Sequence, residues 1–177
     1  MKKLIFFVLV CGVMSACTSF WPFSQSEHFY IPSDKKPVLK NNAFVYFQDS
    51  LQANKVDTFQ LDVKDKLYQD TENDYWEYYY ILYNKINQKT TFFNCFITTR
   101  TVDRLTFGIT ISSLYYYPNR ETINYSIHGK DYSDVKIAHL NSVNTSDTVP
   151  NNIYFSYLNG IIRYEYKDGR VYNLVSK

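Results

Sequence analysis

The sequence predicts a mainly β protein whose folded part is a single antiparallel β-sandwich or an incomplete barrel. Aromatic residues make up 19% of the 177 residues, and 18 residues are tyrosine, which favours strands over helices. Apolar and polar residues alternate with a period of two in most segments after residue 42, whereas helical periodicity is weak. Turn-forming residues separate these segments at intervals of roughly 8–15 residues, as in sandwiches and barrels.

The alternating segments predict about ten strands in a single domain. In chain order they cover residues 43–48, 56–63, 75–83, 91–99, 105–117, 122–127, 134–140, 153–157, 161–166 and 171–175. Residues 134–140 also fit a short helix. So many short strands in a chain of this length favour one β layer folded onto itself or onto a second layer.

Turn dipeptides divide the segments at the C-terminus. Asn159-Gly160 and Asp168-Gly169 are predicted to be type I′ turns, in which both central residues need positive φ. The last three strands are therefore predicted to form an antiparallel meander.

The N-terminus has the pattern of a secretory signal. Lys2 and Lys3 precede the uncharged residues 4–14, a run too short to span a bilayer but typical of a signal peptide. The segment Met14-Ser15-Ala16-Cys17 resembles the lipobox of bacterial lipoproteins, and this resemblance implies cleavage before Cys17 and lipid attachment to it. A plain secretory signal cut after Ala16 is the alternative and would leave Cys17 an ordinary thiol.

This reading divides the chain into three parts. Residues 1–16 are the signal peptide, residues 17–42 are the lipidated cysteine with a proline-bearing tether, and residues 43–177 are one β-rich domain. Removing Lys2 and Lys3 leaves 19 − 2 = 17 basic residues against 17 acidic ones. A neutral mature chain lacks the basic excess of a nucleic-acid-binding protein.

Cysteine use does not indicate a disulfide framework. Only Cys17 and Cys95 remain after cleavage, and lipidation of Cys17 would leave Cys95 without a partner in the chain. Cys95 lies in the apolar run of residues 91–97, so we expect a buried, inert thiol.

Two groups of residues are candidates for function. Tyr115, Tyr116 and Tyr117 form a candidate contact surface if they are exposed, because tyrosine combines a stacking ring with a hydroxyl. They would equally serve as core residues. The tyrosine content also fits a general compositional bias, because the enrichment extends along the whole chain.

The second group holds the best candidates for metal binding or acid–base chemistry: His128, Asp131, Asp134 and His139. The competing interpretation places His128-Gly129-Lys130-Asp131 in a hairpin turn and leaves the side chains of Asp134 and His139 solvated. The chain has no phosphate-binding loop, dinucleotide fingerprint or Gly-x-Ser-x-Gly motif, so no cofactor is predicted.

The C-terminal residues carry a second resemblance. Gly160-Ile161-Ile162-Arg163-Tyr164, then Asp168-Gly169 and Tyr172-Asn173-Leu174, resemble the closing strands of small lipoproteins of the Bacteroidetes. That resemblance implies a location in the cell envelope and brings no activity with it. No acidic residue follows Cys17 directly, which by the same resemblance implies an outer-membrane anchor facing the periplasm.

These observations favour a membrane-tethered, non-catalytic binding or structural module. Its partners would be the membrane, through the lipid, and a protein or a glycan, but not nucleic acid. The alternative is a small envelope hydrolase or metal-binding protein that uses His128, Asp131, Asp134 and His139.

Overall fold

Strands make up almost all regular structure in the computed structural model, which describes residues 28–69, 75–86, 91–99, 105–111, 113–140 and 147–175. The strands are β1 (His28–Phe29), β2 (Phe44–Asp49), β3 (Val56–Gln69), β4 (Tyr75–Lys85), β5 (Thr91–Thr99), β6 (Leu105–Ile111), β7 (Leu114–Pro118), β8 (Ile123–Ile127), β9 (Lys130–Leu140), β10 (Asn152–Ser156), β11 (Gly160–Glu165) and β12 (Val171–Val175). A short 3-10 helix, η1, spans Ser33–Lys35.

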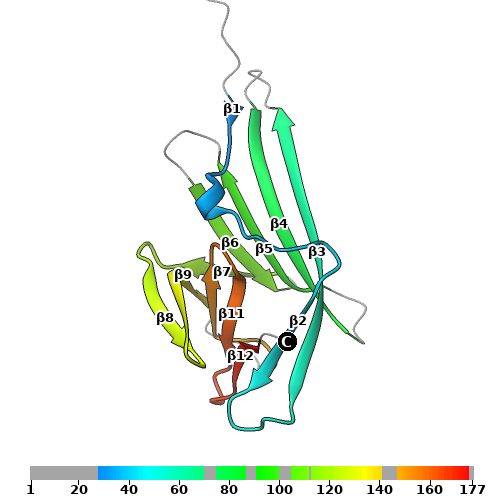
Figure 1. Cartoon of the computed structure of the whole chain (residues 1–177), viewed down its shortest axis with the longest axis vertical. Coiled ribbons are helices and arrows are strands. Elements are labelled where there is room, and N and C mark those ends of the chain that lie inside the picture. The colour runs from blue at the N-terminus through cyan, green and yellow to red at the C-terminus, as the bar shows by residue number, and fades with distance from the viewer. Residues whose placement is uncertain are drawn as a thin grey trace, which may run out of the picture.

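Ten of the strands close into one antiparallel barrel. Their order is β4-β3-β2-β12-β11-β10-β9-β7-β6-β5, and β5 pairs back with β4. Two strands lie outside this ring: β1 pairs in parallel with β4, and β8 pairs with β9. The long hairpin of β3 and β4 extends past the other strands at one end of the barrel (Figure 1).

The predicted β class and the barrel alternative are confirmed, and the sandwich alternative is wrong. Closure depends on two pairings between strands distant in sequence, β2 with β12 and β7 with β9. These pairings complete the ring, whereas the sequence predicted an incomplete barrel. An alternating strand looks the same in either architecture, so the pattern alone could not decide between them.

The inward side chains fill the barrel. Phe47, Phe59, Phe93 and Tyr164 pack against one another with ring centroids 5.1–6.5 Å apart, and each is fully buried. Burial of one such side chain stabilises the fold by about 1.5–3 kcal/mol. The interior is therefore a packed aromatic core.

Hydroxyl groups in this core have fixed partners. The hydroxyl of Tyr116 donates to the carbonyl oxygen of Pro150 at 2.6 Å, and that of Tyr164 donates to the Asp57 carboxylate at 2.8 Å. The Tyr83 hydroxyl accepts the backbone N–H of Ile161 at 2.9 Å. These bonds offset the cost of burying a polar atom, so tyrosine serves here as a core residue.

Residues 28–42, which we call the N-terminal strap, lie against the barrel. The backbone N–H of Ile31 donates to the Glu77 carboxylate at 2.7 Å, and the Ile31 side chain is buried. The Lys36 ammonium pairs with Glu77 and, at 2.5 Å, with Asp65. The Tyr79 hydroxyl donates to the carbonyl oxygen of Pro37 at 2.9 Å, and burial raises the pKa of Tyr79 to about 12.

The strap also reaches the opposite side of the ring. Lys35 pairs with Asp134 of β9 at 3.0 Å, and the backbone N–H of Val38 donates to the carbonyl oxygen of Leu158 at 3.1 Å. The folded unit therefore includes residues 28–42, which the sequence assigned to the tether. The remaining tether residues, 17–27, and the predicted signal peptide lie outside the described residues.

The hairpin of β8 and β9 covers part of the outer wall. Val135, Tyr132 and Ile127 of this hairpin pack with Ile162 of β11 in a second, smaller cluster. Asp134 has a positive φ of 53°, and the β8–β9 register shifts between Ile123 and Tyr125. Such irregularities bend a strand, which allows the hairpin to turn over its neighbours.

Several predicted boundaries differ from the observed ones. The predicted strand over residues 105–117 divides into β6 and β7, which pair antiparallel with Ile111 facing Leu114. Residues 134–140 form a strand, as part of β9. Strand β3 continues to Gln69 because it pairs along its whole second half with β4.

The two C-terminal turns are not type I′, so that prediction is wrong. Gly160 and Gly169 have positive φ values of 74° and 87°, but Asn159 and Asp168 do not. A single left-handed glycine is typical of hairpin loops longer than two residues. Positive φ at two successive residues occurs instead at His128-Gly129, where the sequence also predicted a turn. The three-stranded C-terminal meander itself is confirmed.

Candidate functional site

The predicted lipid-attachment residue, Cys17, lies outside the described residues, so its modification stays a prediction. Within the described ranges, the chain forms no helix of the length and apolarity that a bilayer crossing requires.

The four polar candidates do not form a common site. His128 and Asp131 are exposed beside the tight turn between β8 and β9. His139 lies eight residues beyond Asp131 on the same strand, a separation of up to about 26 Å along an extended chain. Asp134 has a different partner, Lys35 of the strap, at 3.0 Å.

His139 is also engaged elsewhere, because its Nδ1 is 2.8 Å from the amide oxygen of Asn152. In the ranges that the structure describes, no three His, Cys, Asp or Glu side chains gather in a way that could hold a metal ion. The hydrolase or metal-binding alternative therefore has no assembled site among the residues that motivated it.

Cys95 is a core residue. It is 1% exposed, it is a free thiol, and burial raises its pKa well above the ordinary value. A thiol held neutral in an apolar setting is a poor nucleophile. The predicted burial of this thiol is confirmed, and its raised pKa agrees with the expectation that it is inert.

The three consecutive tyrosines divide between the two faces of the barrel wall. Tyr116 is fully buried, so the interpretation of all three as contact residues is wrong for this one. Side chains alternate along a strand, so Tyr115 and Tyr117 of β7 point outward. Tyr115 is half-buried and Tyr117 is 55% exposed.

Pairing between strands extends this outward pair into a larger group. The Tyr115 ring lies 4.8 Å from that of Tyr117 and 6.3 Å from that of Phe96 on β5. Phe96 in turn faces Tyr80 of β4 in the strand register. We call these four residues, Tyr80, Phe96, Tyr115 and Tyr117, the aromatic patch.

Gly108 of β6 shapes the middle of the patch. Phe96 is its direct neighbour across the strands, and a side chain at Gly108 would come within 2.4 Å of the Phe96 ring and 2.6 Å of the Tyr115 hydroxyl. The φ of Gly108 is not in the left-handed region, so space, and not backbone conformation, explains the glycine. Its absent side chain lets the Phe96 ring lie across the sheet surface.

Charges lie at one end of the patch. The ammonium groups of Lys64 and Lys66 are 5.7 and 6.0 Å from the centre of the Tyr80 ring, a cation–π arrangement. Asp62 pairs with Lys64 at 2.9 Å. At the other end, partial burial and then the neighbouring Tyr117 raise the pKa of Tyr115, so its hydroxyl stays protonated at neutral pH.

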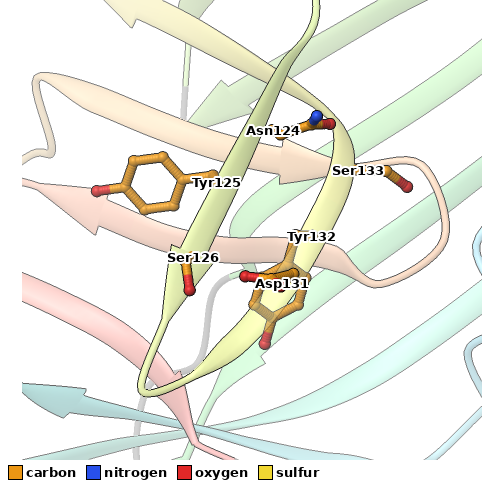
Figure 2. Close-up of a pocket in the computed structure, with 6 residues that line it drawn as sticks. All are labelled: Asn124, Tyr125, Ser126, Asp131, Tyr132 and Ser133. Atoms are coloured by element: carbon orange, nitrogen blue, oxygen red, sulfur yellow. The ribbon is translucent and has the colours of Figure 1, made fainter.

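The β8–β9 hairpin carries a second candidate surface. A shallow hollow of about 440 Å³ is lined by Asn124, Tyr125, Ser126, Asp131, Tyr132 and Ser133. Figure 2 shows that these side chains do not converge, because Tyr125 points away from Asn124 and Ser133. Its one carboxylate, Asp131, and its scattered hydroxyls do not form a reactive centre.

A neighbouring groove separates the tip of this hairpin from the outer face of β2 and β12. Two adjoining hollows of about 240 and 220 Å³ share the residues Lys130, Tyr132, Leu174 and Val175. Tyr132 is buried, and the Lys130 ammonium lies 4.9 Å from the centre of its ring. The lining of this groove also includes Phe44, which is 50% exposed.

Sequence reasoning identified Tyr115 and Tyr117 but missed Tyr80, Phe96 and Gly108. Strand alternation places Phe96 and Cys95 on opposite faces of β5. Their proximity to Tyr115 depends on the β5–β6 and β6–β7 registers, which no local pattern in the chain specifies.

Comparison with known proteins found no matching family model, no matching curated protein and no matching solved structure.

Proposed function

We propose that this chain is a cell-envelope lipoprotein, anchored to the outer membrane through Cys17, that acts as a non-catalytic binding module. The lipobox-like segment Met14-Ser15-Ala16-Cys17 supports the anchor. The observation that carries the binding role is the aromatic patch on the outer wall of a barrel whose interior is packed with side chains.

The chain length sets how far the barrel lies from the bilayer. His28, where the described structure begins, follows Cys17 by eleven residues, and eleven residues span at most about 40 Å. A barrel held within that distance of the membrane meets partners at the membrane surface or in the adjacent envelope layer. The proposed location is the periplasmic side, because no acidic residue directly follows Cys17.

Lipid attachment is tested by metabolic labelling of the expressed protein with a radioactive or clickable fatty acid. The native protein should be labelled and the Cys17→Ala variant should not. Persistence of the label in Cys17→Ala would refute the assignment of the anchor.

The binding role is tested by crosslinking in intact envelopes, with native protein and the Tyr117→Ala variant compared at equal expression. A component captured by the native protein should be lost in the variant. Identical capture profiles would show that the patch does not mediate binding.

A further inference from the structure

The patch offers ring surfaces to solvent, not a deep apolar pocket. The Phe96 ring lies over the backbone at Gly108, so its outer side faces away from the barrel. Tyr117 is 55% exposed and meets Tyr115 at an interplanar angle of 69°. The surface is therefore faceted, with adjacent rings turned toward different directions.

The size of the patch argues against a large protein interface. An aromatic side chain carries roughly 150–250 Å² of surface, so three mostly buried rings and the 55% exposed Tyr117 present roughly 300 Å². A stable protein–protein interface buries about 800 Å² on each partner. The patch covers well under half of that, whereas a short chain of small rings needs only a few stacking positions.

The charge around the patch also constrains its ligand. Lys64 and Lys66 lie at the Tyr80 end, and Lys64 is already paired with Asp62. At the other end, the exposed His139 of β9 faces Tyr117 in the strand register, with its Nδ1 2.8 Å from the Asn152 amide oxygen. The Phe96–Tyr115–Tyr117 end consists of two neutral phenols and a hydrocarbon ring. Beside His139, this end therefore provides stacking and hydrogen bonding without a carboxylate, ammonium or guanidinium group of its own.

One neighbouring polar atom lacks a partner. Asn94 faces Thr110 across β5 and β6, and Thr110 faces Tyr115 across β6 and β7. The Asn94 amide oxygen is buried and has no hydrogen-bond donor among the described residues. A buried acceptor without a donor is costly, and a hydroxyl group or water that reached it would satisfy it.

We propose that the aromatic patch binds a neutral glycan chain, with the apolar faces of its sugar rings packed against Phe96, Tyr115 and Tyr117. Pyranose rings are faceted, carry hydroxyls at their rims and expose C–H groups on their faces. They match the Phe96–Tyr115–Tyr117 end of the patch, which combines aromatic faces with phenol hydroxyls and carries no charged group of its own. This inference rests on the proposed function, since it names the partner class of the same surface.

The test is calorimetric titration of the full mature lipoprotein in a detergent without a sugar headgroup. The probes are three neutral hexasaccharides: chitohexaose, cellohexaose and maltohexaose. We expect at least one to bind, and Tyr117→Ala to weaken that binding about tenfold, because an aromatic contact contributes about 0.5–1.5 kcal/mol beyond burial.

Three further variants separate stacking from other effects. Tyr117→Phe keeps the ring and should bind within about threefold of the native protein, an affinity change below about 0.7 kcal/mol. Tyr30→Ala removes a tyrosine that is 61% exposed outside the patch and should bind as the native protein does. Gly108→Ala should weaken binding, because the added methyl group displaces the Phe96 ring.

Two results would overturn the glycan inference: none of the three hexasaccharides binds, or Tyr117→Ala binds them as well as the native protein does. The envelope crosslinking described above separates this failure from failure of the proposed function. Patch-dependent capture of a protein, with no hexasaccharide bound, refutes the glycan and keeps the binding role. If no hexasaccharide binds and no component is captured in a way that depends on Tyr117, both the glycan inference and the binding role are refuted.

Discussion

Tyr116 and Tyr117 are neighbours on β7, yet the barrel wall gives them opposite environments. Tyr116 is fully buried, and its hydroxyl donates to the Pro150 carbonyl oxygen at 2.6 Å. Tyr117 is 55% exposed, and its ring packs against that of the adjacent outward residue Tyr115, with the ring centroids 4.8 Å apart. One residue type thus serves as a core element on one face and as a contact element on the other.

The comparison extends to the whole barrel. Inward aromatic side chains such as Phe59 and Phe93 pack tightly with one another and are fully buried, whereas the outer wall carries the half-buried Tyr115 and the exposed Tyr117. Aromatic content by itself therefore does not distinguish a stacking surface from a core. The direction in which each side chain points makes the distinction, and strand alternation sets that direction.

The largest predicted effect is the loss of stability when one ring is removed from the barrel interior. Phe59→Ala should destabilise the barrel by about 3–5 kcal/mol, because a cavity replaces a ring that contacts Phe47, Phe93 and Tyr164. Chemical denaturation monitored by circular dichroism measures this loss. A change below about 1 kcal/mol would mean that the interior is not packed as described.

A smaller effect is expected when a single hydroxyl group is removed from Tyr116 or from Tyr117. Tyr116→Phe should cost about 1–3 kcal/mol, since it leaves the Pro150 carbonyl oxygen buried without its donor. Tyr117→Phe should leave the unfolding free energy within about 0.5 kcal/mol of the native value. Equal costs for the two substitutions would contradict the assignment of opposite faces.

Alkaline pH should also lower the free energy of unfolding, because tyrosines of the barrel are buried. Burial raises the pKa of Tyr79 from its ordinary value of 10.0 to about 12 in the folded protein. A raised folded-state pKa means that the unfolded state loses its proton first, so stability is fully present below pH 10 and falls as pH rises toward 12.

Unfolding curves measured between pH 9 and pH 12 check this dependence. The Tyr79→Phe variant should lose stability less steeply over the interval from pH 10 to pH 12 than the native protein does. The same slope in both proteins would show that Tyr79 does not contribute to it.

The smallest expected effect is on the unfolding free energy when an exposed side chain of the outer wall is removed. Tyr117→Ala should change the unfolding free energy by no more than about 0.5 kcal/mol, because its side chain is more than half exposed. A much larger loss would place Tyr117 in the stabilising core and remove it as a contact residue.

Local patterns predicted much of the strand content. Alternation at residues 43–48 and 171–175 anticipated β2 and β12. It could also have separated Tyr116 from Tyr115 and Tyr117, because three successive strand residues cannot share one face.

The remaining features depend on contacts between distant residues. Barrel closure requires Tyr46 to pair with Val175, and the patch requires Phe96 to reach Tyr115 through an intervening strand. Similarly, the Lys35–Asp134 ion pair joins the strap to β9 across 99 residues of sequence. Such pairings follow from the packing of the whole chain, and no short segment encodes them.

The measurement that tests the account most directly is the binding of a neutral hexasaccharide to native protein and to Tyr117→Ala, with the unfolding midpoint of each measured in parallel. The account predicts about tenfold weaker binding in the variant, or about 1.4 kcal/mol, with an unchanged midpoint. Unchanged binding, or a loss of binding accompanied by a lowered midpoint, would contradict the separation of a stabilising interior from a binding outer wall.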